Sequence, residues 1–297
     1  MYQACRQCCI NQMYRICDVL DTSPEVREHV LERGMEVLEG FGTADDLHDS
    51  AMGFGLVWNA ISPILGTRDL YHAEKRHHNE LALSMLDRAR EAVTSSPVPL
   101  RQALAFAAAG NLIDFAPGHD LGDDQMERVV QDALTLRFAI DDSEELVERL
   151  SASRSVAYIV DNCGEVVFDR VLIEELLRQD PSRAVTVIVR NGPIINDVTM
   201  EEAEQVGLTK LCRVIPSGDP HAPAGNVMRN ISEEARRAIL DADVVISKGQ
   251  GNFEGMRGER HPGLYFVLRA KCDVMSRACG CQMMDLVCAS ARRYVAA

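Results

Sequence analysis

Short apolar runs alternate with segments of helical periodicity in the C-terminal half of the chain, and this alternation constrains the fold most strongly. The runs cover residues 156–160, 184–189, 211–215, 243–247 and 264–269, with a shorter one at 286–289. They are rich in β-branched and aromatic side chains, which is typical of buried strands. Strands that alternate with helices usually pair in parallel. We therefore predict a doubly wound α/β/α sandwich with a mostly parallel sheet.

Residues 1–150 have a different pattern, with apolar residues at helical spacing along most of their length. Ser23 followed by Pro24 predicts a helix start, because Ser caps a helix N-terminus and Pro fits the first turn. We therefore predict a helical N-terminal domain over residues 1–150 and a Rossmann-like α/β domain over residues 151–297.

The chain of 297 residues has a formal net charge of −14 and a pI of about 5.0. This acidic surplus disfavours nucleic acid as a partner, because phosphate backbones are bound by basic surfaces. It is compatible with a small phosphorylated ligand, since a bound metal reverses the local sign of charge. The sequence has no run of about twenty apolar residues and no apolar signal segment at its start. We therefore expect a cytoplasmic protein that does not contact membranes.

Polar residues gather where the first two predicted strands end. Asp161 and Asn162 follow the first strand, and Arg190, Asn196 and Asp197 follow the second. The carboxyl ends of parallel strands lie on one edge of a sheet, which is where such folds bind ligands. Asp161, Asn162 and Asp197 offer three oxygen ligands to a hard cation such as Mg²⁺. Taken alone, Asp-Asn-x-Gly is more often an Asx turn with a helix cap.

The fourth predicted strand leads into a glycine-rich segment, Lys248-Gly249-Gln250-Gly251-Asn252-Phe253-Glu254. Backbone N–H groups in such a loop suit a phosphate, and the lysine neutralises its charge. The segment is not a Walker A loop, because its lysine precedes the glycines, and it does not continue as the GxGxxG of dinucleotide sites. We therefore predict that Lys248, Gly249 and Gly251 hold a phosphate beside the cation.

Two strings, Asp161-Asn162-x-Gly164-Glu165-x-x-x-Asp169 and Lys248-Gly249-x-Gly251-Asn252-x-Glu254, resemble the signatures of the damage-control phosphatase family, or domain of unknown function eighty-nine. Shorter matches extend over nearly the whole chain: Asp69-x-Tyr71 with Lys75 and Asn79, Gly110-Asn111 with Asp114, Asn196-Asp197, and Lys271-Cys272. Cys5-x-x-Cys8 together with Cys272 resembles the prokaryotic subfamily.

The resemblance implies a metal-dependent phosphatase that hydrolyses small phosphorylated metabolites, such as sugar phosphates or damaged cofactor phosphates. It implies that Asp161, Asn162 and Asp197 carry the divalent metal (Mg, Mn, Co or Ni), and that Lys248 faces the phosphate. The residues expected to bind substrate are Asn111, Arg190, Gly249, Gly251, Asn252 and Glu254, and those expected to act in catalysis are Asp161, Glu165 and Lys248.

Asp161 has two possible roles in such a reaction: it holds the metal only, or it attacks phosphorus and forms an aspartyl-phosphate. Haloacid-dehalogenase phosphatases use the second route and need an Asp two residues further on, where this chain has Cys163. We therefore favour direct attack by water. Glu165 and Glu254 are expected to orient water or metal ligands. Asp169, one turn beyond Glu165, either braces the site or is an ordinary polar helix residue.

The chain has ten cysteines, most of them clustered near its two ends, and in a chain expected to be cytoplasmic they point away from a disulfide framework. Cys5, Cys8 and Cys272 have a spacing compatible with a structural Zn²⁺, which would need one further ligand. The alternative is that they are small buried hydrophobic residues. The histidines near residue 75, including His72, lack the HExxH pattern and are expected to be solvated or capping.

Two other functions fit the same residues. The cation and phosphate pocket could bind a phosphorylated metabolite without turnover, or the terminal cysteines could stabilise an interaction protein with zinc. Metal-dependent release of phosphate from an aryl phosphate would separate the phosphatase from both. The oligomeric state is left open by the sequence.

Overall fold

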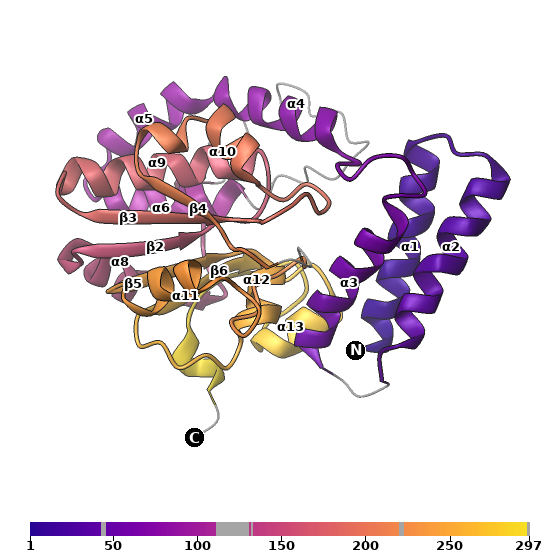
Figure 1. Cartoon of the computed structure of the whole chain (residues 1–297). Helices are drawn as coiled ribbons and strands as arrows, with labels where there is room; N and C mark the ends of the chain where they lie inside the picture. Colours follow the sequence, from indigo (N-terminus) through magenta and orange to yellow (C-terminus); the bar gives the residue numbers. More distant parts are fainter. Residues whose placement is uncertain (43–45, 111–130, 132, 220–222, 296–297) are drawn as a thin grey trace.

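The computed structural model describes residues 1–42, 46–110, 131, 133–219 and 223–295. Asn111, which was predicted to contact substrate, lies outside the described residues. The described chain forms one seven-stranded sheet with helices on both faces, and a bundle of three helices stands beside it (Figure 1).

The strands are β1 (Ile140–Asp141), β2 (Ser155–Ile159), β3 (Ala184–Val189), β4 (Arg213–Pro216), β5 (Val244–Lys248), β6 (Leu264–Arg269) and β7 (Leu286–Ser290). Their order in the sheet is β1-β7-β6-β5-β2-β3-β4, and only the β6–β7 pair of this sheet is antiparallel. The predicted mostly parallel α/β sandwich is therefore confirmed. Strand β1 was not predicted from the sequence, because a two-residue strand has no periodicity to recognise.

The α-helices are α1 (Gln3–Val19), α2 (Pro24–Glu39), α3 (Leu47–Ile61), α4 (His72–Leu83), α5 (Leu86–Thr94), α6 (Pro99–Ala109), α8 (Ser143–Ala152), α9 (Glu165–Gln179), α10 (Met200–Gln205), α11 (Glu233–Leu240), α12 (Gln250–Met256) and α13 (Asp273–Cys279). The predicted start of α2 is confirmed, since Ser23 Oγ accepts a hydrogen bond from the Val26 N–H and Pro24 occupies the first turn. No helix in the described part of the chain is long and apolar enough to cross a membrane.

Side chains of the sheet alternate between two apolar cores. Val156 and Tyr158 of β2 belong to the core shared with α5, α6, α8 and α9, whereas Ala157 and Ile159 belong to the core shared with α11, α12 and α13. Successive residues of a strand point to opposite faces. Because both faces are covered, β2 has no polar alternation and appears in the sequence as a continuous apolar run.

Helices α1, α2 and α3 share a third core, which includes Met13, Val30 and Trp58. Helices α4, α5 and α6 pack on α9 instead and thereby belong to one layer of the sandwich (Figure 1). The packing of these helices shows no boundary at residue 150. The division into two domains at that residue therefore stays a prediction.

Candidate active site

The first polar loop follows β2, which lies between β5 and β3 in the sheet. The strand order changes direction here, since β3 and β4 lie on one side of β2 and β5, β6 and β7 on the other; ligands bind at such points. Asp161 is buried at the strand end, and Gly164 ends the loop with a φ of 81°. Glycine adopts this φ without the strain that a Cβ would bring, so the turn into α9 depends on it.

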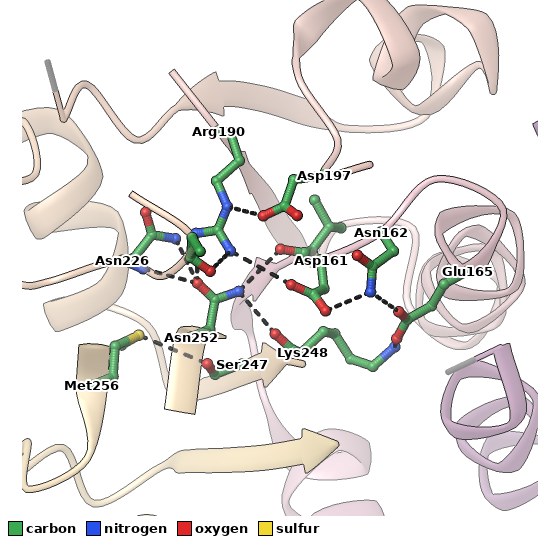
Figure 2. Close-up of polar contacts among 12 residues, drawn as sticks. Asp161, Asn162, Glu165, Arg190, Asp197, Asn226, Ser247, Lys248, Asn252 and Met256 are labelled. Carbon is green, nitrogen blue, oxygen red and sulfur yellow. Dashed lines mark hydrogen bonds and ion pairs between the residues drawn. The ribbon is translucent and has the colours of Figure 1, made fainter. Parts of the chain in front are cut away.

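The second polar loop, after β3, is joined to the first by backbone hydrogen bonds. The N–H of Cys163 donates to the carbonyl of Asn196 at 2.8 Å, and the N–H of Val198 donates to that of Asp161 at 2.9 Å. Asn162 and Asp197 consequently form an isolated antiparallel bridge. This pairing brings together the three residues predicted to hold a metal (Figure 2).

Two buried carboxylates therefore share one site. Burial raises the pKa of Asp161 well above its ordinary value, and the charges of Asp197 and Glu165 raise it further. Burial also raises the pKa of Asp197, although Arg190 opposes the shift. Two carboxylates and an amide are hard oxygen donors, and the excess negative charge between them favours a cation. The residues present thus fit a hard divalent cation such as Mg²⁺ or Mn²⁺.

Arg190 was predicted to bind substrate, but its guanidinium is held by the protein itself. It donates to Asp197 Oδ2 at 2.6 Å and to Asn252 Oδ1 at 2.8 Å, and one nitrogen lies 3.5 Å from Asp161 Oδ1. A further hydrogen bond reaches the Ala224 carbonyl at 2.9 Å. In this structure Arg190 fixes the two aspartates in place, and substrate contact by Arg190 stays a prediction (Figure 2).

Lys248 differs most from expectation. Its side chain is fully buried, and its ammonium donates to Glu165 Oε1 and Asp169 Oδ1, each at 2.6 Å, and to the Ala107 carbonyl at 2.8 Å. Burial alone would lower the pKa of Lys248, but the two carboxylates raise it above its ordinary range. The ammonium thus faces these acceptors, and the phosphate contact expected of Lys248 stays a prediction. Of the two roles considered for Asp169, its contact with Lys248 favours bracing.

Glu165 connects this buried lysine to the cation loop. One carboxylate oxygen accepts from Lys248, and the other accepts from Asn162 Nδ2 at 3.2 Å. Asn162 Nδ2 also donates to Asp161 Oδ2 at 2.6 Å. A chain of contacts therefore runs from Lys248 through Glu165 to Asn162 and Asp161 (Figure 2).

The glycine-rich segment after β5 approaches the cation loop very closely. A Cβ on Gly249 would lie 1.9 Å from Asp161 Oδ2, so this position requires glycine. Asn252, predicted to bind substrate, is buried and donates to the carbonyls of Lys248 at 2.8 Å and Val160 at 3.1 Å. Its amide therefore links two strand ends inside the protein, behind the cavity.

The segment Ala224–Asn226, which packs against the start of α12, was not predicted from the sequence. A Cβ on Gly225 would lie 1.7 Å from the Gly251 carbonyl oxygen, and the N–H of Asn226 donates to Asn252 Oδ1 at 3.0 Å. The signal that could have indicated this contact was a Gly-Asn pair in a loop, which is too common to single out.

A cavity of about 430 Å³ lies between this sheet edge and the bundle of α1 and α3. Its lining includes Asp161, Asn162, Glu165, Asp197, Gly251 and Glu254 on the sheet side. The opposite side includes Cys5, Cys8, Gln12 and Arg15 of α1, and Lys271, which follows the sheet strand β6, also lines the cavity. The cavity thus brings the predicted cation residues and two cationic side chains, Arg15 and Lys271, around one space.

Lys271 and Glu254 give this cavity an uneven charge. Lys271 is exposed, and its charge lowers the pKa of Asp161, against the larger effect of burial. Glu254 is buried, and burial raises its pKa to about 8. A carboxyl with this pKa is mostly protonated at neutral pH and is able to donate a proton.

The cysteines predicted to hold zinc all line this cavity, but their arrangement does not favour a zinc site. Among the residues that the structure describes, one group of three or more Cys, His, Asp or Glu side chains has its ligand atoms within 4.8 Å of one another, namely Asp69, His72 and Glu202. That set could hold a metal, although the Lys75 ammonium already lies 2.6 Å from Asp69 and Glu202. Structural zinc at the cysteines stays a prediction.

Comparison with known proteins identifies the family. A sequence model described as the damage-control phosphatase ARMT1-like domain matches residues 1–287. The chain belongs to the damage-control phosphatase family. A damage-control phosphatase from Pyrococcus horikoshii is 31% identical over 287 residues, which cover 96% of each chain. A damage-control phosphatase from Archaeoglobus fulgidus is 27% identical over 291 residues, which cover 95% of this chain and 96% of that one.

The fold agrees with this membership in the damage-control phosphatase family. A crystal structure of a DUF89 family protein from Pyrococcus horikoshii superposes with a TM-score of 0.87 at 30% identity, covering 97% of this chain and 98% of the other. The resemblance noted in the sequence is therefore confirmed. Membership of a family whose named relatives are damage-control phosphatases implies phosphatase activity.

Proposed function

We propose that the chain is a metal-dependent phosphatase that hydrolyses small phosphorylated metabolites. The observation that carries this proposal is the backbone pairing of the loops after β2 and β3, which sets Asp161, Asn162 and Asp197 together at one cavity. Three hard oxygen donors at the switch point of a parallel sheet suit a divalent cation beside a phosphate.

Asp161, Asn162 and Asp197 would hold the cation, with Arg190 fixing the two carboxylates from behind. When bound, a divalent cation supplies Lewis acidity to a phosphoryl oxygen and lowers the pKa of a water. The negative charge of the phosphate is balanced on the protein side by Lys271, which lines the same cavity. Lys271 thus takes the phosphate contact that the sequence suggested for Lys248, whose ammonium is buried behind Glu165.

Glu254 is suited to protonate the leaving group. It lines the cavity, and its pKa of about 8 keeps the carboxyl neutral near pH 7. Hydrolysis of an alkyl phosphate expels an alkoxide oxygen, which needs a proton in or after the transition state. Glu165 has a different role, because its contacts to Lys248 and Asn162 hold the cation loop.

Direct attack by water is favoured over an aspartyl-phosphate. The second route needs an acid two residues after the nucleophile, and Cys163 at that position is fully buried. Burial raises the pKa of the Cys163 thiol well above its ordinary value. Both oxygens of Asp161 also have neighbours, Asn162 at 2.6 Å and Arg190 at 3.5 Å, as is expected of a ligand held in one orientation.

The cavity volume supports a metabolite as substrate, since pockets for small molecules typically occupy roughly 300–1,000 Å³. The decisive experiment measures phosphate release from sugar and cofactor phosphates with Mg²⁺, Mn²⁺, Co²⁺ or Ni²⁺. We expect activity that EDTA removes and that one of these metals restores. Asp197→Ala should lower kcat by about a thousandfold or more while the protein stays folded. Binding of phosphorylated metabolites without turnover would instead support a non-catalytic binding protein.

A further inference from the structure

We propose that helix α4 braces both cation loops through Asn79 and Lys75, which act as positioning residues without touching the substrate. This inference rests on the proposed function, because it concerns the geometry of the same cation site. The two side chains lie one helical turn apart, four residues from each other, and both are fully buried. Each one reaches a different loop of the site.

Asn79 holds the first loop at its most constrained residue. Its Oδ1 accepts a hydrogen bond from the Gly164 N–H at 2.7 Å, across 85 residues of sequence. Gly164 stands two residues after Asn162, has a φ of 81° and precedes the first turn of α9. The N–H groups at the start of a helix lack partners within the helix, so a side chain that accepts there fixes the turn. Asn79 therefore determines where the Asp161–Asn162 loop ends.

Lys75 holds the second loop through Glu202. The Lys75 ammonium lies 2.6 Å from carboxylate oxygens of both Asp69 and Glu202. Glu202 accepts hydrogen bonds from the Thr199 N–H at 2.8 Å and the Thr199 hydroxyl at 2.6 Å. Thr199 stands two residues after Asp197, so the position of the second aspartate follows from this capping box.

A buried lysine such as Lys75 contributes little net stability to the fold. Taking an ammonium and its carboxylate partners out of water offsets much of their attraction, and well-packed apolar side chains are often as stable. Polar contacts of this kind do, however, fix one arrangement of the groups they join. The Lys75 ammonium also accounts for the cluster of Asp69, His72 and Glu202, because it supplies the positive charge that a metal would otherwise provide.

The two contacts act on the same quantity, the relative position of Asp161, Asn162 and Asp197. Groups that orient metal ligands without touching the metal typically change its affinity by roughly 10–100-fold when removed. Loss of either contact is therefore expected to weaken cation binding and to lower kcat. KM for the phosphorylated substrate should change little at saturating metal, since neither Asn79 nor Lys75 is among the described residues that line the cavity.

The test compares Asn79→Leu and Lys75→Met with matched controls, using Mn²⁺ binding measured by calorimetry. Gln205→Leu removes the partner of Asn79 Nδ2, at 2.8 Å, and leaves the Gly164 contact intact. Arg76→Met removes an exposed neighbour of Lys75 that faces Glu80. We expect the two brace variants to raise the Mn²⁺ dissociation constant about tenfold or more, and both controls to stay within about twofold. Equal effects of Asn79→Leu and Gln205→Leu would overturn the proposal.

Two further measurements apply if Asn79→Leu or Lys75→Met fails to fold, or if the wild-type protein binds no Mn²⁺. Asn79→Asp keeps the acceptor for Gly164, so it should retain Mn²⁺ binding; a folded Asn79→Asp protein without Mn²⁺ binding would overturn the brace. Hydrogen exchange of the amides of residues 163–165, measured without metal, should be faster in Asn79→Leu than in Gln205→Leu. Unchanged exchange contradicts the brace, whereas absent Mn²⁺ binding by the wild type contradicts the proposed function.

Discussion

On the sheet side of the cavity the polar side chains are tied to one another, whereas on the α1 side they lie along one face of a single helix. Asp161, Arg190 and Lys248 each have several partners at 3.5 Å or less. Cys5, Cys8, Gln12 and Arg15 follow one another at spacings of three or four residues, which places them on one helical face.

This difference indicates a division of work between the two sides. A substitution on the sheet side leaves a charged or polar partner buried, so its effects spread to the cation loops. A substitution on the cavity face of α1 is expected to act mainly on what the substrate meets, because the opposite face of that helix packs in the core of the bundle. The sheet side is therefore suited to hold the chemistry, and the α1 side to select the metabolite.

The largest effects are expected when the two lysines of the site are each exchanged for methionine. Lys248→Met leaves the Glu165 and Asp169 carboxylates buried without their cation, which should lower the free energy of unfolding by about 3–5 kcal/mol. Lys271→Met removes an exposed cation, so we expect nearly unchanged stability and a raised KM. Urea unfolding and steady-state kinetics of both variants measure these effects.

The stability loss in Lys248→Met should depend on pH in a defined direction. Burial raises the pKa of Asp169 to about 6 even with Lys248 present, and loss of the ammonium raises it further. A carboxyl whose folded pKa is raised binds its proton more tightly when folded, so stability falls as pH rises through that range. The deficit should thus be smaller at pH 5 than at pH 8. An unchanged stability with a raised KM would restore the phosphate contact first predicted for Lys248.

Much of the fold could be predicted because its signals are local. The runs at residues 184–189 and 264–269 became β3 and β6 with the same boundaries, since strands covered on both faces are apolar throughout. The two-residue β1 could not be found in this way. The packing of α4–α6 on α9 was equally inaccessible, because helical periodicity identifies an apolar face but not the element that covers it.

The candidate site shows the same limit at the level of single side chains. Strand ends identified Asp161, Asn162 and Asp197 as neighbours, because topology alone brings those ends together. Topology does not specify where a long side chain points, and the Lys248 ammonium turns inward to two carboxylates of α9. Lys271 was noted only as part of a motif, since a lysine after a strand carries no sign that it lines a cavity.

Glu254 is a sheet-side residue that we expect to act on the leaving group. Glu254→Gln should lower kcat for alkyl phosphates about a hundredfold, since the amide cannot donate a proton as the neutral carboxyl does. Phosphate esters with good leaving groups, such as p-nitrophenyl phosphate, should be affected much less. The wild-type kcat for alkyl phosphates should fall above pH 8, where the carboxyl loses its proton, and this limb should be absent in the variant.

The control for this experiment is Glu259→Gln, which changes a partly buried glutamate five residues further along the chain. Its pH profile should match that of the wild type. An equal loss of kcat for alkyl and p-nitrophenyl phosphates in Glu254→Gln would assign the residue to the cation loops and not to the leaving group.

The smallest expected effect lies on α1 and tests whether that side selects the metabolite. Arg15 lines the cavity opposite the aspartates, so it is placed to meet a second anionic or hydroxyl-rich part of the substrate. Arg15→Met should raise KM about tenfold for metabolites with a second acidic group, which corresponds to about 1.4 kcal/mol. KM for a plain aryl phosphate and the Mn²⁺ affinity should stay unchanged.

Arg27→Met on α2, which removes an exposed ion pair with Asp18, provides the matched control. A uniform rise of KM for all substrates would move Arg15 to the phosphate itself, and a loss of Mn²⁺ affinity would show that the two sides of the cavity are not independent.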